Sequence, residues 1–279
     1  MKRAVSRQAA ATLPKAPLAE VVFELRWVLH GGQGVPTLFQ VDPGYLPAEE
    51  AFTAEAAGLG FPSVRNMGGP GEMAGGHAIA RRFYVAPDKE FPLLQIGPGI
   101  FASNQSSEYS WPSFKDQTLR GIKALLNSYP SLRSFSLKPI YLELRYIDAF
   151  DASLVGTIDF VQFLADGTTV ELKPPPMFGD ATVFSGPSSG RLLIARNLRA
   201  WKSSQFSIDL GSGQRKDEPI LRSETKVFTS NDGVPALTSR HQRFLTEIEK
   251  WLEFAHGVTS PFFKELVSEA AMAKFKEPQ

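Results

Sequence analysis

The sequence contains no cysteine, so disulfides, thiolate metal sites and cysteine nucleophiles are all excluded. It also lacks any apolar run of the roughly 18 residues that a membrane-spanning helix needs, and we expect no membrane association. No charge of one sign dominates: the formal net charge is +1, which argues against a protein whose main task is to neutralise phosphates. The remaining composition, 43% hydrophobic and 21% charged, predicts a soluble globular protein, and the lack of cysteine suits the reducing cytoplasm.

Motifs for catalysis and for cofactor binding are also missing. The four histidines, His30, His77, His241 and His256, show no zinc-ligand spacing. The Gly-Gly-Gln-Gly stretch at 31–34 lacks the spacing of a phosphate-binding loop and predicts a plain turn. We therefore predict no metal site, no cofactor and no catalytic residues, and the sequence favours a protein that is not an enzyme.

One short pattern occurs twice. The segment 17–27, Pro-Leu-Ala-Glu-Val-Val-Phe-Glu-Leu-Arg-Trp, returns at 139–146 as Pro-Ile-Tyr-Leu-Glu-Leu-Arg-Tyr. Each copy is rich in apolar and aromatic residues and ends in Glu-Leu-Arg-aromatic, which is typical of a strand. The repeated pattern predicts two related halves.

The elements expected in each half come in the same order: a strand, a helix, about three strands and a long helix. In the first half we expect strand 18–29, helix 47–57, strands 77–86, 93–97 and 99–105, and helix 111–129. In the second half we expect strand 139–149, helix 157–164, strands 191–198, 205–210 and 220–228, and helix 237–254, followed by a terminal helix at 261–275.

This order predicts an α+β protein built from two β-α-β-β-β-α pseudo-repeats. Joined through their strands, the repeats form one curved antiparallel sheet with the long helices on one face. The element order resembles the saddle of the TATA-box-binding protein, and two separate α+β domains side by side are the alternative. The expected organisation is a disordered basic arm at 1–16, a first half at 17–134, a second half at 135–258 and a helical tail at 259–279.

Four blocks of the sequence resemble a family of bacterial proteins. They are the opening Pro-Leu-x-Glu-Val-x-Phe-Glu-Leu-Arg motif at 17–26, and the segments 94–104, 141–148 and 241–254, the last followed by Val258-Thr259. The family that they resemble is uncharacterised, of about this size and sporadically distributed. The resemblance implies no activity and no site residues, while the patchy distribution implies a role in a mobile-element or defence-type system.

Two Glu-x-Arg pairs are the first candidate site. Glu24 and Arg26, and likewise Glu143 and Arg145, lie two residues apart on strands, so each pair faces one side of the sheet. Such charges ordinarily form cross-strand ion pairs, here between the halves where the first strands meet. Alternatively, the four residues form a ligand-contacting stripe at the centre of the sheet, in which each arginine addresses a carboxylate or a phosphate.

A basic region is the second candidate site. Residues 191–226 include eight basic and four acidic residues, with aromatic residues between them. The candidate patch consists of Arg191, Arg196, Arg199, Trp201, Lys202, Arg222 and Lys226. It predicts either a nucleic-acid-binding face, with the aromatic rings available for stacking, or a solvated outer face whose long side chains cover apolar surface.

The predicted function rests on the predicted sheet, because the sequence shows no catalytic motif. Long antiparallel sheets with free edges favour the addition of a partner strand, so we predict a non-enzymatic binding or assembly component that contacts another protein through its sheet face or edges. The alternatives are a nucleic-acid-binding module that uses residues 191–226, and a hydrolase whose site is assembled from dispersed residues. Self-association into a homo-oligomer remains open.

Overall fold

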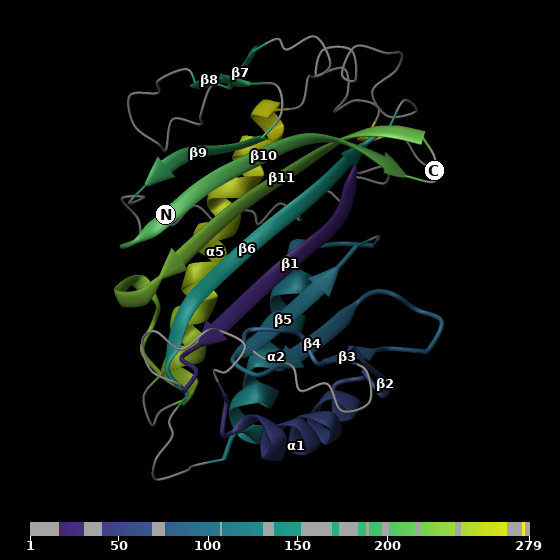
Figure 1. Ribbon diagram of the computed structural model, residues 1–279, viewed down its shortest axis with the longest axis vertical. Coiled ribbons are helices and arrows are strands. Elements are labelled where there is room, and N and C mark those ends of the chain that lie inside the picture. The colour runs from purple at the N-terminus through teal and green to yellow at the C-terminus, as the bar shows by residue number, and fades with distance from the viewer. Residues whose placement is uncertain are drawn as a thin grey trace, which may run out of the picture.

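A nine-stranded antiparallel sheet is the framework of the protein (Figure 1). The computed structural model describes residues 17–30, 41–68, 76–106, 108–130, 137–151, 169–172, 184–187, 190–196, 201–215, 218–237, 241–266 and 275–276. Together, its helices and its open, curved antiparallel sheet define an α+β fold, as the sequence predicts.

The sheet grows outward from two strands at its centre, β1 (Leu18–Trp27) and β6 (Pro139–Phe150), which pair with each other. Beside β1 follow, in order, β5 (Ile100–Gln105), β4 (Leu93–Gly97), β3 (Arg81–Tyr84) and β2 (Ser63–Asn66). Beside β6 follow β11 (Glu218–Ser230), β10 (Ser204–Arg215) and β9 (Gly190–Arg196), while β7 (Thr169–Leu172) and β8 (Phe184–Pro187) form a separate hairpin.

The register of the central pair is symmetric with respect to the repeated motif. Glu24 lies opposite Glu143, the residue at the same place in the other copy, and Phe23 lies opposite Leu144. Strands then follow outward on both sides, as two related halves require. The helix expected at 157–164 lies outside the described residues, so the duplication itself stays a prediction.

The helices cover one face of this sheet. α2 (Trp111–Ser128) packs on β5, α5 (His241–Leu266) packs on β6 and β11, and α1 (Tyr45–Gly58) lies beside α2 (Figure 1). A short 3-10 helix, η3 (Asn231–Gly233), follows β11. Within the described ranges, none of the helices combines the length and the apolar character needed to cross a membrane.

The core lies between the sheet and these helices and is shared by both halves. Alternate residues of β1, including Phe23 and Leu25, are buried against the helix layer. The ring of Phe23 lies 6.1 Å from that of Trp251 in α5, so the first strand packs on the last helix. Because one apolar cluster unites both halves, the structure forms a single sheet and not two separate domains.

The C-terminal region departs from the prediction. The sequence places a break near 258 and a separate helix from 261, but α5 continues through Pro261 to Leu266. Proline removes one backbone hydrogen bond from a helix, whereas Phe262 is buried and its ring lies 4.8 Å from that of Phe206 in β10. This packing outweighs the local cost of the proline. The predicted basic arm at 1–16 lies outside the described residues.

Asp42 connects four parts of the first half. Its Oδ2 accepts hydrogen bonds from the Trp27 indole (2.9 Å), the Gly99 backbone N–H (3.0 Å) and the Tyr129 hydroxyl (2.6 Å). Its Oδ1 accepts from the Gly44 backbone N–H (3.0 Å), just before α1. Gly99 has a φ of +72° at the turn between β4 and β5, a conformation that favours glycine. The buried carboxylate therefore joins the end of β1, this turn and the ends of two helices.

Replacing Asp42 with alanine should lower the free energy of unfolding by about 4 kcal/mol, because all four of its donors lose their acceptor. Asp42→Asn is the matched control: its carboxamide oxygen can still accept from Trp27, Gly99 and Tyr129, and only the bond from Gly44 is lost. We expect the asparagine variant to lose less than half as much stability in urea unfolding at pH 7. Equal losses for the two variants would contradict this assignment.

Candidate functional site

Charged side chains cross the centre of the sheet on the face that the helices leave uncovered. Side chains alternate between the faces of a strand, so Glu24 and Arg26 project away from the core that holds Phe23 and Leu25. The cross-strand register extends this row over three neighbouring strands. We call the row the charged stripe; its members are Glu24 and Arg26 on β1, Glu143 and Arg145 on β6, and Arg222, Glu224 and Lys226 on β11.

Both predicted Glu-x-Arg pairs meet at the middle of the stripe. Glu24 and Glu143 are direct register partners, and both are buried. The Arg26 guanidinium bonds to the Glu24 carboxylate on its own strand, and Arg145 lies 3.5 Å from Glu143 on its own strand. Among the described residues no ion pair joins β1 to β6, so the expected ion pairs between the halves do not form there.

Cross-strand ion pairs form instead between β6 and β11. Lys226 Nζ lies 3.8 Å from Glu143, and Arg145 Nη1 lies 3.7 Å from Glu224. Arg222 Nη2 lies 3.5 Å from the same Glu224. The β6 and β11 members therefore form a connected network of ion pairs, and each of the three carboxylates of the stripe has at least one cation beside it.

Two aromatic rings close one end of the stripe. The rings of Tyr141 and Phe228 lie 6.0 Å apart at 31°. The Arg26 guanidinium lies 5.1 Å from the centre of the Tyr141 ring, and Lys226 Nζ lies 5.8 Å from that of Phe228, both within the range of cation–π attraction. The contact of Arg26 with Tyr141 links β1 to β6 across the stripe.

Tyr141 also fixes the central carboxylate. Its hydroxyl donates to Glu143 Oε2 at 2.5 Å. Burial, and then the neighbouring Glu143 charge, raise the pKa of Tyr141 far above its usual value, so the phenol remains a donor throughout the physiological range.

The three arginines form the outermost layer of the stripe, whereas the side chain of Lys226 is only 12% exposed. The side chains of Arg26, Arg145 and Arg222 are 40%, 29% and 48% exposed, whereas those of Glu24, Glu143 and Glu224 are 11%, 7% and 10% exposed. Buried carboxylates thus hold one side of each guanidinium and leave the other side toward solvent.

A second polar network continues on the same face toward the other sheet edge. Arg82 donates to Gln95 (2.8 Å), Gln95 donates to Asn104 (2.7 Å), and Asn104 donates to Glu20 (2.5 Å). This chain of bonds runs over β3, β4, β5 and β1. The uncovered face is therefore polar on both sides of the central pair.

The predicted basic patch is divided in the structure. Arg222 and Lys226 belong to the charged stripe, Arg191 and Arg196 lie on β9, and Arg199 lies outside the described residues. Trp201 and Lys202 lie instead beside η3: the Trp201 indole donates to the Gly233 carbonyl (2.8 Å), and Lys202 Nζ lies 2.6 Å from Asp232. The Trp201 ring stacks on Phe254 of α5, so it packs against the helix layer.

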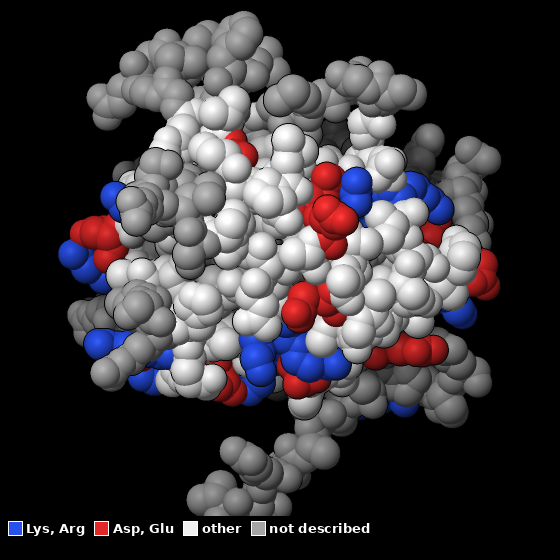
Figure 2. All heavy atoms as spheres, turned by 90° about the horizontal axis from the view of Figure 1, so that it is seen from below, with Lys and Arg blue, Asp and Glu red and all other residues white. Residues whose placement is uncertain are grey.

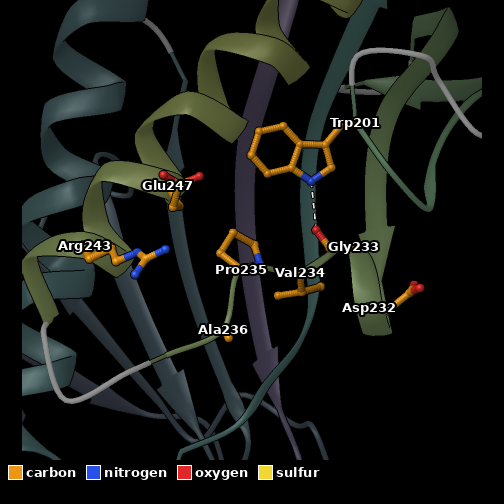
Figure 3. Close-up of a pocket in the computed structure, with 8 residues that line it drawn as sticks. All are labelled: Trp201, Asp232, Gly233, Val234, Pro235, Ala236, Arg243 and Glu247. Atoms are coloured by element: carbon orange, nitrogen blue, oxygen red, sulfur yellow. Dashed lines mark hydrogen bonds between the residues drawn. The ribbon is translucent and has the colours of Figure 1, made fainter.

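A shallow pocket of about 340 Å³ lies beside this tryptophan, between η3 and the first turns of α5 (Figure 3). In Figure 3, Trp201 lies on one side and Arg243 and Glu247 of α5 lie on the other. The lining residues are Trp201, Asp232, Gly233, Val234, Pro235, Ala236, Arg243 and Glu247. None of them belongs to the charged stripe.

Part of the site was missed by the sequence analysis. Glu224, Tyr141 and Phe228 all take part in the network, and none of the three was singled out. The sequence contains a signal for Glu224, since Arg222-x-Glu224-x-Lys226 has the period of two that marks one face of a strand. In the described part of the chain, no group of three or more His, Cys, Asp or Glu side chains is placed to hold a metal ion.

Comparison with known proteins adds no family to this description. No protein-family model matches the chain, and no curated protein matches its sequence.

Burial should make Glu143 more important for stability than an exposed glutamate with a similar partner. Glu143→Ala removes the acceptor of the Tyr141 hydroxyl and leaves Lys226 and Arg145 without that carboxylate, so we expect a loss of about 3 kcal/mol in the free energy of unfolding. Glu253→Ala breaks an exposed pair with Lys115 (2.6 Å) and should cost less than about 1 kcal/mol. Urea midpoints measure both losses of stability. A loss for Glu143→Ala no larger than that for Glu253→Ala would show that the stripe contributes little to stability.

Proposed function

We propose that the protein is a non-enzymatic binding component that docks a protein partner on the uncovered face of its sheet, over the charged stripe. In this proposal the protein acts in the bacterial cytoplasm, as part of the mobile-element or defence-type system that its family resemblance implies. The partner surface carries acidic groups that meet the three arginines, and basic groups or hydrogen-bond donors between them.

The arrangement of the arginines carries the proposal. Each guanidinium is held from below by a buried carboxylate, so Arg26, Arg145 and Arg222 are ordered before a partner arrives. Ordering side chains in advance reduces the entropy lost on binding. An arginine whose remaining N–H groups face solvent is suited to a carboxylate, which it can bind through two parallel hydrogen bonds.

Charge balance favours a protein over a nucleic acid. The stripe combines four cations with three carboxylates, and the whole chain has a formal charge of +1. Figure 2, which views the molecule from below and not onto the stripe, shows acidic and basic side chains next to one another among the coloured residues, with no continuous field of one sign. A phosphate backbone is attracted mainly by uncompensated positive charge, whereas a protein surface can match interleaved charges.

Neutralising the outermost arginines should weaken partner binding. The partner is first identified as the protein that co-purifies with the native chain, and its Kd is then measured with purified components. We expect Arg26→Gln/Arg222→Gln to raise this Kd at least tenfold, because two ordered cations are lost. The control is Arg120→Gln, which removes an exposed arginine of α2 on the helix-covered side and should leave Kd unchanged.

Cooperative urea unfolding will confirm that the variants are folded, with a lower midpoint expected where a buried carboxylate loses its cation. If the double variant binds the partner as tightly as wild type does, the stripe is not the docking surface. If the co-purifying chain is a second copy of the protein, light scattering of the double variant will show whether the stripe forms that contact.

Nucleic acid is the second candidate, and salt dependence separates it from a protein partner. We expect the Kd for a labelled single-stranded DNA or RNA to be no tighter than about 10 μM at physiological salt, the range of non-specific binding. Fluorescence anisotropy at increasing salt measures it. A tighter complex with a steep salt dependence, weakened in Arg222→Gln and Lys226→Gln, would favour the nucleic-acid-binding module.

Hydrolysis is the remaining alternative. Turnover of a nuclease or phosphodiesterase substrate that disappears in Glu24→Ala and Glu143→Ala, but persists in Glu253→Ala, would replace the binding proposal with a dispersed hydrolase site.

A further inference from the structure

Four titratable side chains gather on the opposite, helix-covered side of β6. Tyr146 and Asp148 face the helices because they alternate with the stripe residues of the same strand. Tyr109 precedes α2, and His256 lies on α5. We call these four residues the β6 cluster. None of them belongs to the charged stripe that forms the proposed docking surface.

Hydrogen bonds connect three members in a row. The hydroxyls of Tyr109 and Tyr146 lie 2.9 Å apart, and the Tyr146 hydroxyl lies 2.9 Å from His256 Nδ1. Burial raises the pKa of both tyrosines far above the usual value, so both remain protonated. A neutral Nδ1 accepts from Tyr146, whereas a protonated Nδ1 donates to it. The direction of every bond in the row therefore depends on the protonation of the imidazole.

Asp148 is the fourth member and has no cation beside it among the described residues. Its side chain is buried, at 3% exposure, and this burial raises the pKa of the carboxyl from 3.8 to about 7. Its register partner on β11 is Ser223, whose buried Oγ has no hydrogen-bond partner. The carboxylate charge also raises the pKa of Tyr109 and of Tyr146, so the ionised form interacts with the row of hydroxyls.

Other charged groups approach the cluster from α2 and α5. The Trp111 ring stacks on His256 at 4.0 Å and 9°, and the Trp111 indole donates to Glu253 (3.3 Å). Lys115 Nζ binds the same Glu253 at 2.6 Å. The imidazole thus lies against an indole that is itself hydrogen-bonded to an ion pair between the two helices. A change at His256 acts directly on the contact between α2 and α5.

We propose that Asp148 and His256 make the β6 cluster a proton-linked switch that sets how firmly α5 and the N-terminus of α2 are held on the central strand. When Asp148 is protonated, it carries no charge. Tyr109 then donates its hydrogen bond to Tyr146, and Tyr146 donates to His256. When Asp148 ionises, its carboxylate requires donors, and the nearby hydroxyls of Ser223 and the tyrosines are the groups that can supply them. Redirecting a tyrosine hydroxyl to Asp148 removes the bond that holds His256 of α5.

Because the pKa of Asp148 is raised in the folded protein, the stability of the folded state should decrease as the pH rises. Between pH 3.8 and about 7 the folded protein retains a proton that the unfolded chain has lost. The folded state is therefore favoured at the acid end of this window and loses that advantage as the pH rises toward 7. For one proton, the opening constant can increase by at most tenfold per pH unit.

Hydrogen exchange tests the switch in the full chain. Protection factors of the α5 amides at 255–260 and 262 are measured from pH 5 to 8.5, together with the urea midpoint. In wild type we expect protection to fall through this window, by up to tenfold per pH unit, and to level off above pH 7. In Asp148→Asn the fall should disappear and protection at pH 8 should exceed that of wild type.

Controls separate this switch from general titration of the surface. Asp116→Asn removes an exposed carboxylate of α2, paired with Arg120, and should retain the wild-type profile. Trp111 fluorescence, assigned by its loss in Trp111→Phe, should change over the same window in wild type and not in His256→Gln. Identical profiles in wild type and Asp148→Asn would overturn the proposal, and Asp148→Ser provides the same comparison if the asparagine variant does not fold.

Discussion

The pairing of β1 with β6 is the constraint on which the rest of the structure depends. Its register places Phe23 opposite Leu144 on the helix side and Glu24 opposite Glu143 on the uncovered side. A slip of one residue would exchange the two faces, moving the apolar side chains into solvent and the glutamates into the core. All other strands of the main sheet extend from this pair, so its register determines both the packing of the helices and the composition of the stripe.

Buried carboxylates are accommodated in three different ways, and the differences match three roles. Asp42 accepts four hydrogen bonds from neutral donors and serves as a structural connection. Glu143 is satisfied by a phenol and by cations, which it orders on the surface. Asp148 has no cation near it among the described residues, and burial raises the pKa of its carboxyl to about 7. A buried charge without compensation is costly, so burial favours the protonated form of Asp148.

Much of the fold was predictable because hydrophobic periodicity is a local signal. The predicted strand 18–29 and helix 111–129 match β1 and α2 within two residues. β2 was missed because its Ser-Val-Arg-Asn sequence is short and polar, and α5 was broken too early because a proline within a helix is decided by tertiary packing. The Glu-x-Arg residues were placed on one face correctly, but their partners on β11 depend on strand order, which no local pattern contains. The β6 cluster depends on the approach of α5, which is equally non-local.

The balance of charge on the uncovered face has a physical reason. An open sheet face with large apolar patches would promote association with many partners, and a face of one charge would attract any oppositely charged polymer. The stripe avoids both, since its carboxylates and cations neutralise one another along three strands. Interleaved charges then discriminate between partners, because a surface in the wrong register meets like charges and must desolvate groups that it cannot pair. In the proposed function, the same balance of charge lets this face select one partner.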